Sequence, residues 1–226
     1  MLALVAAAAG LVAGGPITAV ISRVPRKEPV RPAIRFGVPS TRRATFIQLA
    51  CAALFAAAAL RFGFTLALPA WLVLFAALLA ISIIDLEHYI VPNRILIPLT
   101  AAAVPLLALA VLGDDAGVAD FVRGLLGGAI GLTVMFILNL ISPRGMGMGD
   151  VKMSFPLGLY LGFLGWGELV LGFFSAFLLG ALVGVALIAL KRRGRKDAVP
   201  FGPFLAAGTV IAALWGEPIL RWYTGV

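Results

Sequence analysis

Residues 66–85, LALPAWLVLFAALLAISIID, decide the fold class, because nineteen residues without a charged side chain are followed by a carboxylate. Apolar stretches of about 17–25 residues are long enough to cross a bilayer as helices. A carboxylate at the edge of a bilayer is costly to bury, so an acidic residue in such a place is a candidate for function. This stretch therefore predicts a membrane helix with a candidate functional residue, Asp85, at its end.

The rest of the chain is equally apolar. Hydrophobic residues make up 62% of the 226 residues and charged residues 12%, and the mean hydropathy is +1.08. Soluble domains are about 45–50% apolar and about 25% charged, so the composition predicts an all-α, polytopic membrane helical bundle. We expect one integral membrane domain over residues 1–226 with about eight transmembrane helices. Their approximate ranges are 2–21, 45–62, 67–85, 92–112, 120–141, 151–166, 169–190 and 202–222.

The placement of Lys and Arg predicts the membrane topology. All but three of the 18 basic residues fall on one side of the eight-helix arrangement, mostly in a loop at 22–44 and a linker at 191–199. The positive-inside rule puts this basic side in the cytoplasm, together with Asp85 and Asp150. The net charge of +8 is therefore interpreted as a topology signal that also contacts the lipid bilayer, not as a nucleic-acid surface.

Few residues offer metal or disulfide chemistry. Cys51 is the single cysteine, which excludes a disulfide within the chain and a cysteine zinc site. His88 is the single histidine, so the usual zinc ligand sets are absent. The first apolar run has no basic residue before Arg23, so we expect it to stay in the protein as a helix and not to be cleaved as a signal.

The second acidic element is Asp150, which follows Gly147-Met148-Gly149 and precedes Val151-Lys152. Glycines let the backbone approach other groups closely. A helix that starts here would place the Asp150 carboxylate near free N–H groups and the positive end of the helix. The plainer alternatives are an N-cap for Asp150 and an ordinary interface residue for Asp85. Lys152 would either steady an ionised carboxylate or extend to the membrane surface.

Two carboxylates at one membrane face suggest a pair that activates water, with one acting as acid and the other as base. Such a pair titrates as a unit, so neither role is assigned to either residue. Two other readings stay open: a transporter or channel-like bundle that uses the acids for ion or proton passage, and a magnesium site made by Asp85, Glu87 and Asp150. A dinucleotide loop is not expected, because that pattern needs a strand and a third glycine.

Glycines recur at four-residue spacing inside the expected helices. In membranes, pairs of small residues at this spacing allow helices to pack closely. The pairs are Gly10 and Gly14, Gly124 and Gly128, Gly127 and Gly131, Gly158 and Gly162, and Gly180 and Gly184.

Three blocks of sequence together resemble the type IV prepilin peptidases, which are bacterial intramembrane aspartic proteases of the Gly-x-Gly-Asp type. The blocks are GMGDVK at 147–152, DLEHYIVP at 85–92 and VPFGPFLA at 199–206. The resemblance implies a catalytic dyad of Asp85 and Asp150. It also implies supporting roles for the matching motif positions, which are Pro92, Gly147, Gly149 and Lys152.

The resemblance also implies a reaction and a location. Members of the family remove a short basic leader from prepilin or pseudopilin precursors at the cytoplasmic face of the bacterial inner membrane. Many members carry two Cys-x-x-Cys pairs in a larger first loop and methylate the product with S-adenosylmethionine. The loop at 22–44 has no cysteine, so we expect a peptidase that needs no cofactor or metal, and we do not expect methyl transfer. Neither the particular precursor nor the oligomeric state follows from the sequence.

Overall fold

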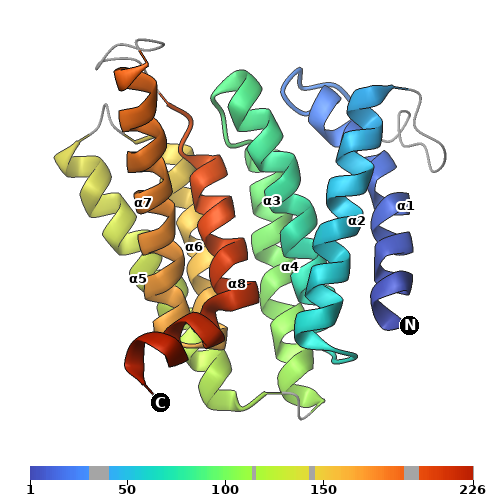
Figure 1. The fold of residues 1–226 in the computed structure, drawn as a ribbon, viewed down its shortest axis with the longest axis vertical. Coiled ribbons are helices and arrows are strands. Elements are labelled where there is room, and N and C mark those ends of the chain that lie inside the picture. Colours follow the sequence, from blue (N-terminus) through green and yellow to red (C-terminus); the bar gives the residue numbers. More distant parts are fainter. Residues whose placement is uncertain (31–40, 114–115, 143–145, 191–198, 226) are drawn as a thin grey trace. The chain divides into compact units, whose positions relative to one another are not determined.

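The computed structural model describes residues 1–30, 41–113, 116–142, 146–190 and 199–225, and this part of the chain forms eight α-helices and no strand (Figure 1). The all-α prediction is therefore confirmed. The helices are α1 (Leu2–Arg23), α2 (Arg42–Phe62), α3 (Leu68–His88), α4 (Asn93–Leu112), α5 (Val118–Ile141), α6 (Met148–Leu164), α7 (Trp166–Ala189) and α8 (Gly202–Thr224). Most of the expected basic loop and linker, at 31–40 and 191–198, lies outside the described residues.

Seven of the described helices are long and apolar enough to cross a membrane, so the chain is a multi-pass membrane protein. The exception is α6, which has 17 residues, 12 of them buried. At about 1.5 Å per residue it is roughly 25 Å long, less than the ~30 Å hydrocarbon core. Because α6 is surrounded largely by protein, its length does not have to match the lipid.

The chain divides into two compact units. The first contains Met1–His88 and Pro92–Gly117, and the second contains Tyr89–Val91 and Val118–Val226. Each unit has one central helix: α3 packs against α1, α2 and α4, and α6 packs against α5, α7 and α8. The single membrane domain expected from the sequence stays a prediction.

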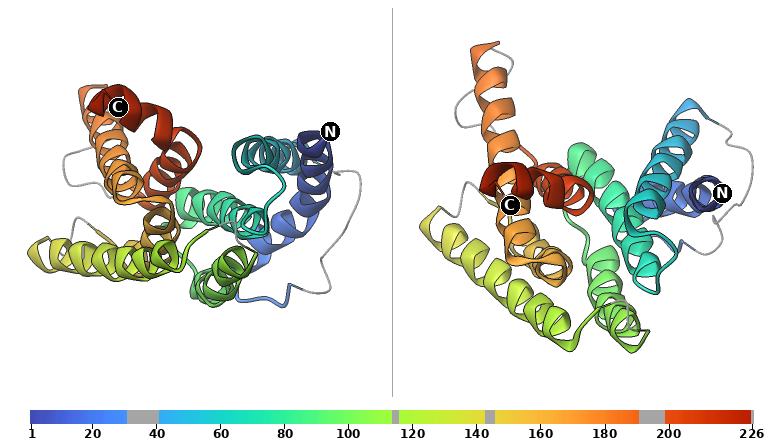
Figure 2. Two further views of the ribbon diagram at one scale, coloured as in Figure 1. Left: turned by 90° about the horizontal axis from the view of Figure 1, so that it is seen from below. Right: turned by 60° about the horizontal axis from the view of Figure 1, so that its bottom comes forward.

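In the first unit, α1 and α2 lie side by side (Figure 2) and meet through glycines. A Cβ atom added at Gly10 would lie 2.6 Å from the Ala52 Cα, and one at Gly14 would lie 2.6 Å from the Gln48 Cα. No side chain fits at either position, so this predicted glycine pair is confirmed as a close helix contact.

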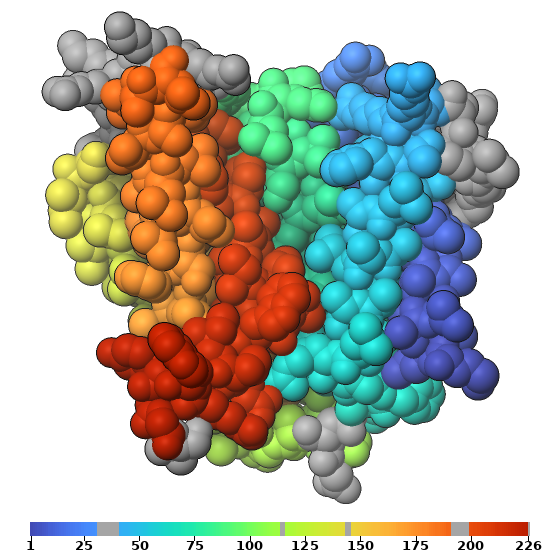
Figure 3. Space-filling model, viewed as in Figure 1, coloured from blue at the N-terminus to red at the C-terminus, as the bar shows by residue number. Residues whose placement is uncertain are grey.

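In the second unit, the glycine prediction is confirmed for α5 and α6 and wrong for one position of α7. A Cβ atom at Gly127 would lie 2.5 Å from the Gly158 carbonyl oxygen, and one at Gly162 would lie 2.8 Å from the Arg123 carbonyl oxygen. Gly184 has no such neighbour within 4 Å. The reason is that α7 lies on the outside of its unit (orange in Figure 3), where only 11% of its apolar window is buried.

Arg123 joins α5 to the C-terminal end of α6. Its Nε donates to the Gly162 carbonyl at 2.7 Å, and its Nη2 donates to the carbonyls of Phe163 and Leu164 at 2.8 and 3.0 Å. Asp120 lies 2.8 Å from the same Nη2. The last carbonyls of a helix have no partner within the helix, so Arg123 satisfies three of them and fixes this end of α6 against α5.

We expect Arg123→Gln to lower the free energy of unfolding by about 2 kcal/mol, because the partly buried carbonyls lose a charged donor. The measurement is thermal unfolding in detergent followed by circular dichroism. Arg221→Gln is the matched control, because it removes an exposed ion pair with Glu217, and such pairs contribute about 0–1 kcal/mol. Equal shifts for the two variants would contradict the assigned role of Arg123.

Candidate active site

Asp85 lies on the buried face of α3. Leu74, Leu78 and Ile81 precede it at steps of four, three and four residues, which is the spacing of one helix face. Those three side chains are at most 1% exposed, and Asp85 is 5% exposed. The Asp85 carboxylate therefore takes the next position on an apolar stripe, where a leucine would otherwise be expected.

The expected helix end at Asp85 is wrong, because α3 continues through Leu86, Glu87 and His88. None of these three residues breaks a helix, and they are exposed where Asp85 is buried. The helix ends where Tyr89 adopts a left-handed backbone conformation, with φ at 57°. Asp85 thus lies in the last turn of α3, close to carbonyl groups that carry a partial negative charge.

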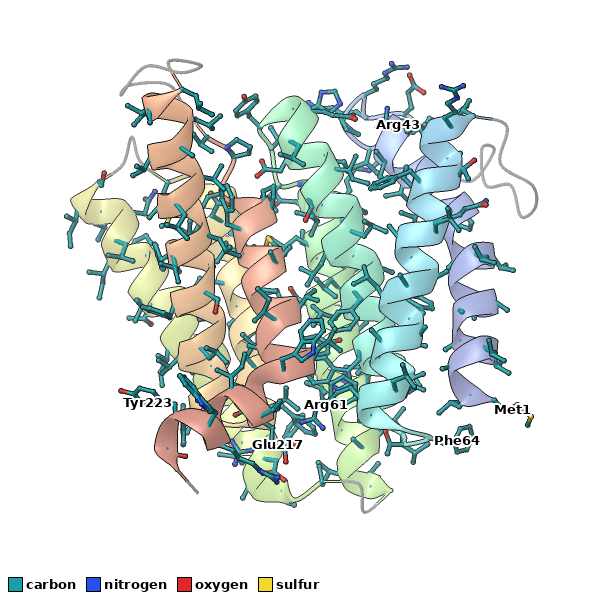
Figure 4. The ribbon with its side chains drawn as sticks, viewed as in Figure 1. Met1, Arg43, Arg61, Phe64, Glu217 and Tyr223 are labelled. Atoms are coloured by element: carbon teal, nitrogen blue, oxygen red, sulfur yellow. The ribbon has the colours of Figure 1, made fainter. Side chains whose placement is uncertain are left out.

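The end of the first unit that holds Asp85 is its basic end. The Arg43 Nη2 atom lies 2.8 Å from the Glu87 Oε2 atom. Arg94, at the start of α4, donates to the Glu28 carbonyl at 3.0 Å. Figure 4 shows Arg43 and Arg61 at opposite ends of α2. Basic residues therefore gather at the Asp85 end of this unit, as the sequence predicts.

Asp150 is the third residue of α6, which begins at Met148 with Gly147 as its N-cap. The Gly147 N–H donates to the Asp150 Oδ2 at 3.2 Å, and Asp150 is 6% exposed. The alternative of Asp150 as an N-cap is therefore wrong, and so is the expected helix start at 151. The expected donor from the glycine turn is confirmed. The positive end of α6 and this N–H both stabilise a negative charge on the carboxylate.

The two carboxylates thus occupy opposite electrostatic positions. Each is buried on the central helix of its own unit, but Asp150 lies at the positive end of α6 and Asp85 near the negative end of α3. Such a difference in environment favours a pair in which one carboxylate donates a proton and the other accepts one.

Asn139 orders the approach to α6 and was not singled out from the sequence. Its Nδ2 donates to the Met146 carbonyl at 2.8 Å, just before the Gly147 N-cap. The sequence did contain a signal for it. An asparagine in the last turn of an apolar helix is costly in a membrane unless its side chain makes a hydrogen bond.

Gly149 is in close contact with Val91, which lies in a distant part of the sequence. A Cβ atom at Gly149 would lie 2.8 Å from the Val91 Cβ and 3.2 Å from its Cγ2. Tyr89–Val91 belong to the same compact unit as α6. This contact explains why the motif has a glycine at position 149. A larger residue would push Val91 away from the first turn of α6.

The remaining predicted residues take simpler places. Pro92 is the N-cap of α4, and its carbonyl accepts hydrogen bonds from the N–H groups of Ile95 and Leu96 at 3.0 and 3.1 Å. Lys152 is exposed and lies two positions after Asp150, so the two side chains leave the helix on different faces. This favours the interpretation in which Lys152 extends to the membrane surface.

The predicted residues form one set in each unit. Asp85 and Pro92 belong to the first unit, and Asp150 belongs to the second with the other motif residues Gly147, Gly149 and Lys152. Among the residues that the structure describes, no group of three or more His, Cys, Asp or Glu side chains is arranged to hold a metal ion.

Together the helices and the two buried carboxylates define a class, the polytopic membrane proteins with acidic residues at the ends of buried helices. Residues 72–185 match the model of the type IV leader peptidase family, and this range contains both aspartates. The chain belongs to the type IV leader peptidase family and is a peptidase. The reading as a transporter or channel is not favoured.

The chain is similar to proteins named prepilin leader peptidase/N-methyltransferase in several bacteria. It is 35% identical to the one from Bacillus subtilis, 34% to that of Aeromonas hydrophila and 35% to that of Pseudomonas aeruginosa. The matches cover 78, 82 and 80% of this chain and 67, 62 and 61% of those relatives. The chain thus spans about two thirds of the relatives' length. No solved structure matches it.

Proposed function

We propose that this protein is an aspartic endopeptidase that removes a short basic leader from type IV prepilin-like precursors. The observation that carries the proposal is the pair of buried carboxylates, Asp85 and Asp150, each at one end of the central helix of its unit. Membership of the leader peptidase family supplies the reaction class.

The path of the chain supports the pairing of the two aspartates. Val91 packs against Gly149, the residue before Asp150. Asp85 precedes Val91 by six residues, and a six-residue segment spans at most roughly 20 Å. The covalent link therefore limits how far Asp85 lies from Val91, the residue that contacts the first turn of α6.

The proposed chemistry is hydrolysis by water held between the two carboxylates. One carboxylate accepts a proton from the water as it attacks the peptide carbonyl, and the other donates a proton to the forming tetrahedral oxygen. The intermediate then collapses: the C–N bond breaks as the group that took the proton from water passes it to the leaving amine nitrogen, and a hydroxyl proton returns to the other carboxylate. The pair acts as one titrating unit, so the roles belong to the pair. Gly147, Gly149 and Pro92 shape the segments that carry the acids and take no part in bond making.

We place the reaction at the cytoplasmic face of the bacterial inner membrane. The support is the positive-inside rule, applied to the Asp85 end of the first unit, where Arg43 and Arg94 lie. The proposed substrates are prepilin or pseudopilin precursors, whose leader stays on this side while the following apolar helix enters the bilayer.

The test is cleavage by the purified protein in proteoliposomes. The substrates are precursors with a basic leader and an apolar helix, taken from the same genome, and the products are read by mass spectrometry and N-terminal sequencing. We expect one cut at the boundary between leader and helix. If no precursor of this type is cut under conditions where a relative cuts its own, the proposed function is wrong.

The names of these relatives also include N-methyltransferase, which makes S-adenosylmethionine the cofactor to examine. We propose that cleavage proceeds without it. Adding S-adenosylmethionine to the same assay separates the two activities, because methyl transfer adds the mass of a methyl group to the new N-terminus and cleavage alone does not.

A further inference from the structure

Three residues leave the first unit and pack with the second. Tyr89–Val91 belong with α5–α8, whereas α3 before them and Pro92 after them belong with α1–α4. We call Tyr89–Val91 the strap. It is the stretch through which the Asp85 helix is connected to the surroundings of Asp150.

The strap begins with a strained residue. Tyr89 has φ at 57°, in the left-handed region that is uncommon for large side chains. Residues held in such conformations persist where the surrounding structure demands them, and they cluster at functional sites. The turn at Tyr89 stops α3 and sends the chain toward α6.

The strap ends in a close contact with the first turn of α6. The nearest atoms to an added Gly149 Cβ are the Val91 Cβ at 2.8 Å, its Cγ2 at 3.2 Å and its backbone nitrogen at 3.5 Å. The first two are closer than ordinary packing and the third is ordinary. The fit therefore depends on one side chain, that of Val91, and on the missing side chain at Gly149.

We infer that Val91 is a positioning residue for Asp150. Its side chain seats the strap against Gly149 and thereby holds the start of α6, where the Gly147 N–H donates to Asp150, in one place relative to the strap. This inference rests on the proposed function, since its effect is measured through cleavage. It assigns Val91 no contact with substrate.

The experiment compares Gly149→Ala, Val91→Gly and the double variant in the full-length protein. Small misplacements of catalytic groups cost up to about 10²-fold in rate, so we expect Gly149→Ala to lower kcat about 100-fold with KM nearly unchanged. Val91→Gly should lower kcat about tenfold by the same argument. The double variant removes the clash and replaces one methyl contact by another, so its kcat should exceed that of Gly149→Ala at least several-fold.

Two controls separate positioning from general damage. Ile90→Gly makes the strap equally flexible but leaves the Val91 side chain in place, and it should retain most of the activity. Val91→Ala keeps the Cβ atom that lies nearest to Gly149, and it too should retain most of kcat. This comparison of Val91→Ala with Val91→Gly still tests the inference if Gly149→Ala does not fold.

The inference is overturned if the double variant is no faster than Gly149→Ala, or if Val91→Gly and Ile90→Gly lose the same activity. A rise in KM with kcat unchanged in Gly149→Ala and Val91→Gly would also overturn it. Failure of the proposed function looks different, because the wild-type protein would then not cleave any precursor.

Discussion

Replacing either aspartate with asparagine is expected to abolish precursor cleavage. Asp85→Asn and Asp150→Asn keep nearly the same shape but remove the group that gives or takes a proton. General acid–base catalysis contributes about 10²–10⁴-fold, so each variant should lose about 10³-fold or more in kcat/KM. Because the two carboxylates act as a unit, the double variant should be little slower than either single one. The measurement is initial-rate cleavage in proteoliposomes.

Glu87→Gln is the matched control for these variants. Glu87 lies two residues from Asp85 but is exposed and paired with Arg43, so we expect cleavage near the wild-type rate. A large loss in Glu87→Gln, together with a requirement of the wild-type protein for added magnesium, would favour the metal site of Asp85, Glu87 and Asp150 instead. Retained cleavage in Asp85→Asn or Asp150→Asn would remove that residue from the dyad.

The sequence predicted the features that depend on local pattern. Eight apolar runs became eight helices in the described residues, because hydrophobic length and hydrogen bonding leave a membrane chain few other structures. Asp85 was predicted as a candidate functional residue at the end of an apolar run, but its place on the buried helix face with Leu78 and Ile81 was not predicted. The glycine turn before Asp150 placed a backbone donor on its carboxylate, as expected from a helix start.

The sequence did not predict the features that depend on distant neighbours. The contact of Val91 with Gly149 joins positions 58 residues apart, and only the fold brings them together. The three carbonyls held by Arg123 lie 39 to 41 residues further along the chain. Gly184 has the same spacing as the packed glycines but faces outward. The four-residue spacing of glycines shows that one helix face lacks side chains. It does not show whether another helix packs against that face.

Adding one methyl group between α5 and α6 is expected to separate the two helices. A Cβ atom at Gly158 would overlap the Gly127 carbonyl oxygen and would lie 3.0 Å from the Gly128 Cα. Both neighbours are backbone atoms of a helix and cannot turn away as a side chain does. Overpacking usually costs 1–3 kcal/mol, occasionally more, and here we expect Gly158→Ala to cost about 3 kcal/mol. That corresponds to a fall of roughly 10 °C in Tm.

Gly184→Ala is the matched control for Gly158→Ala. Gly184 lies inside α7, has no neighbour within 4 Å of an added Cβ, and should gain up to about 1 kcal/mol, since alanine is the better helix former. The two variants add the same atom, so opposite shifts in Tm isolate the interhelical contact from helix propensity. An unchanged Tm for Gly158→Ala would mean that α5 and α6 separate easily. The first turn of α6 would then owe its place to the strap and to Asn139, and not to the glycine contact with α5.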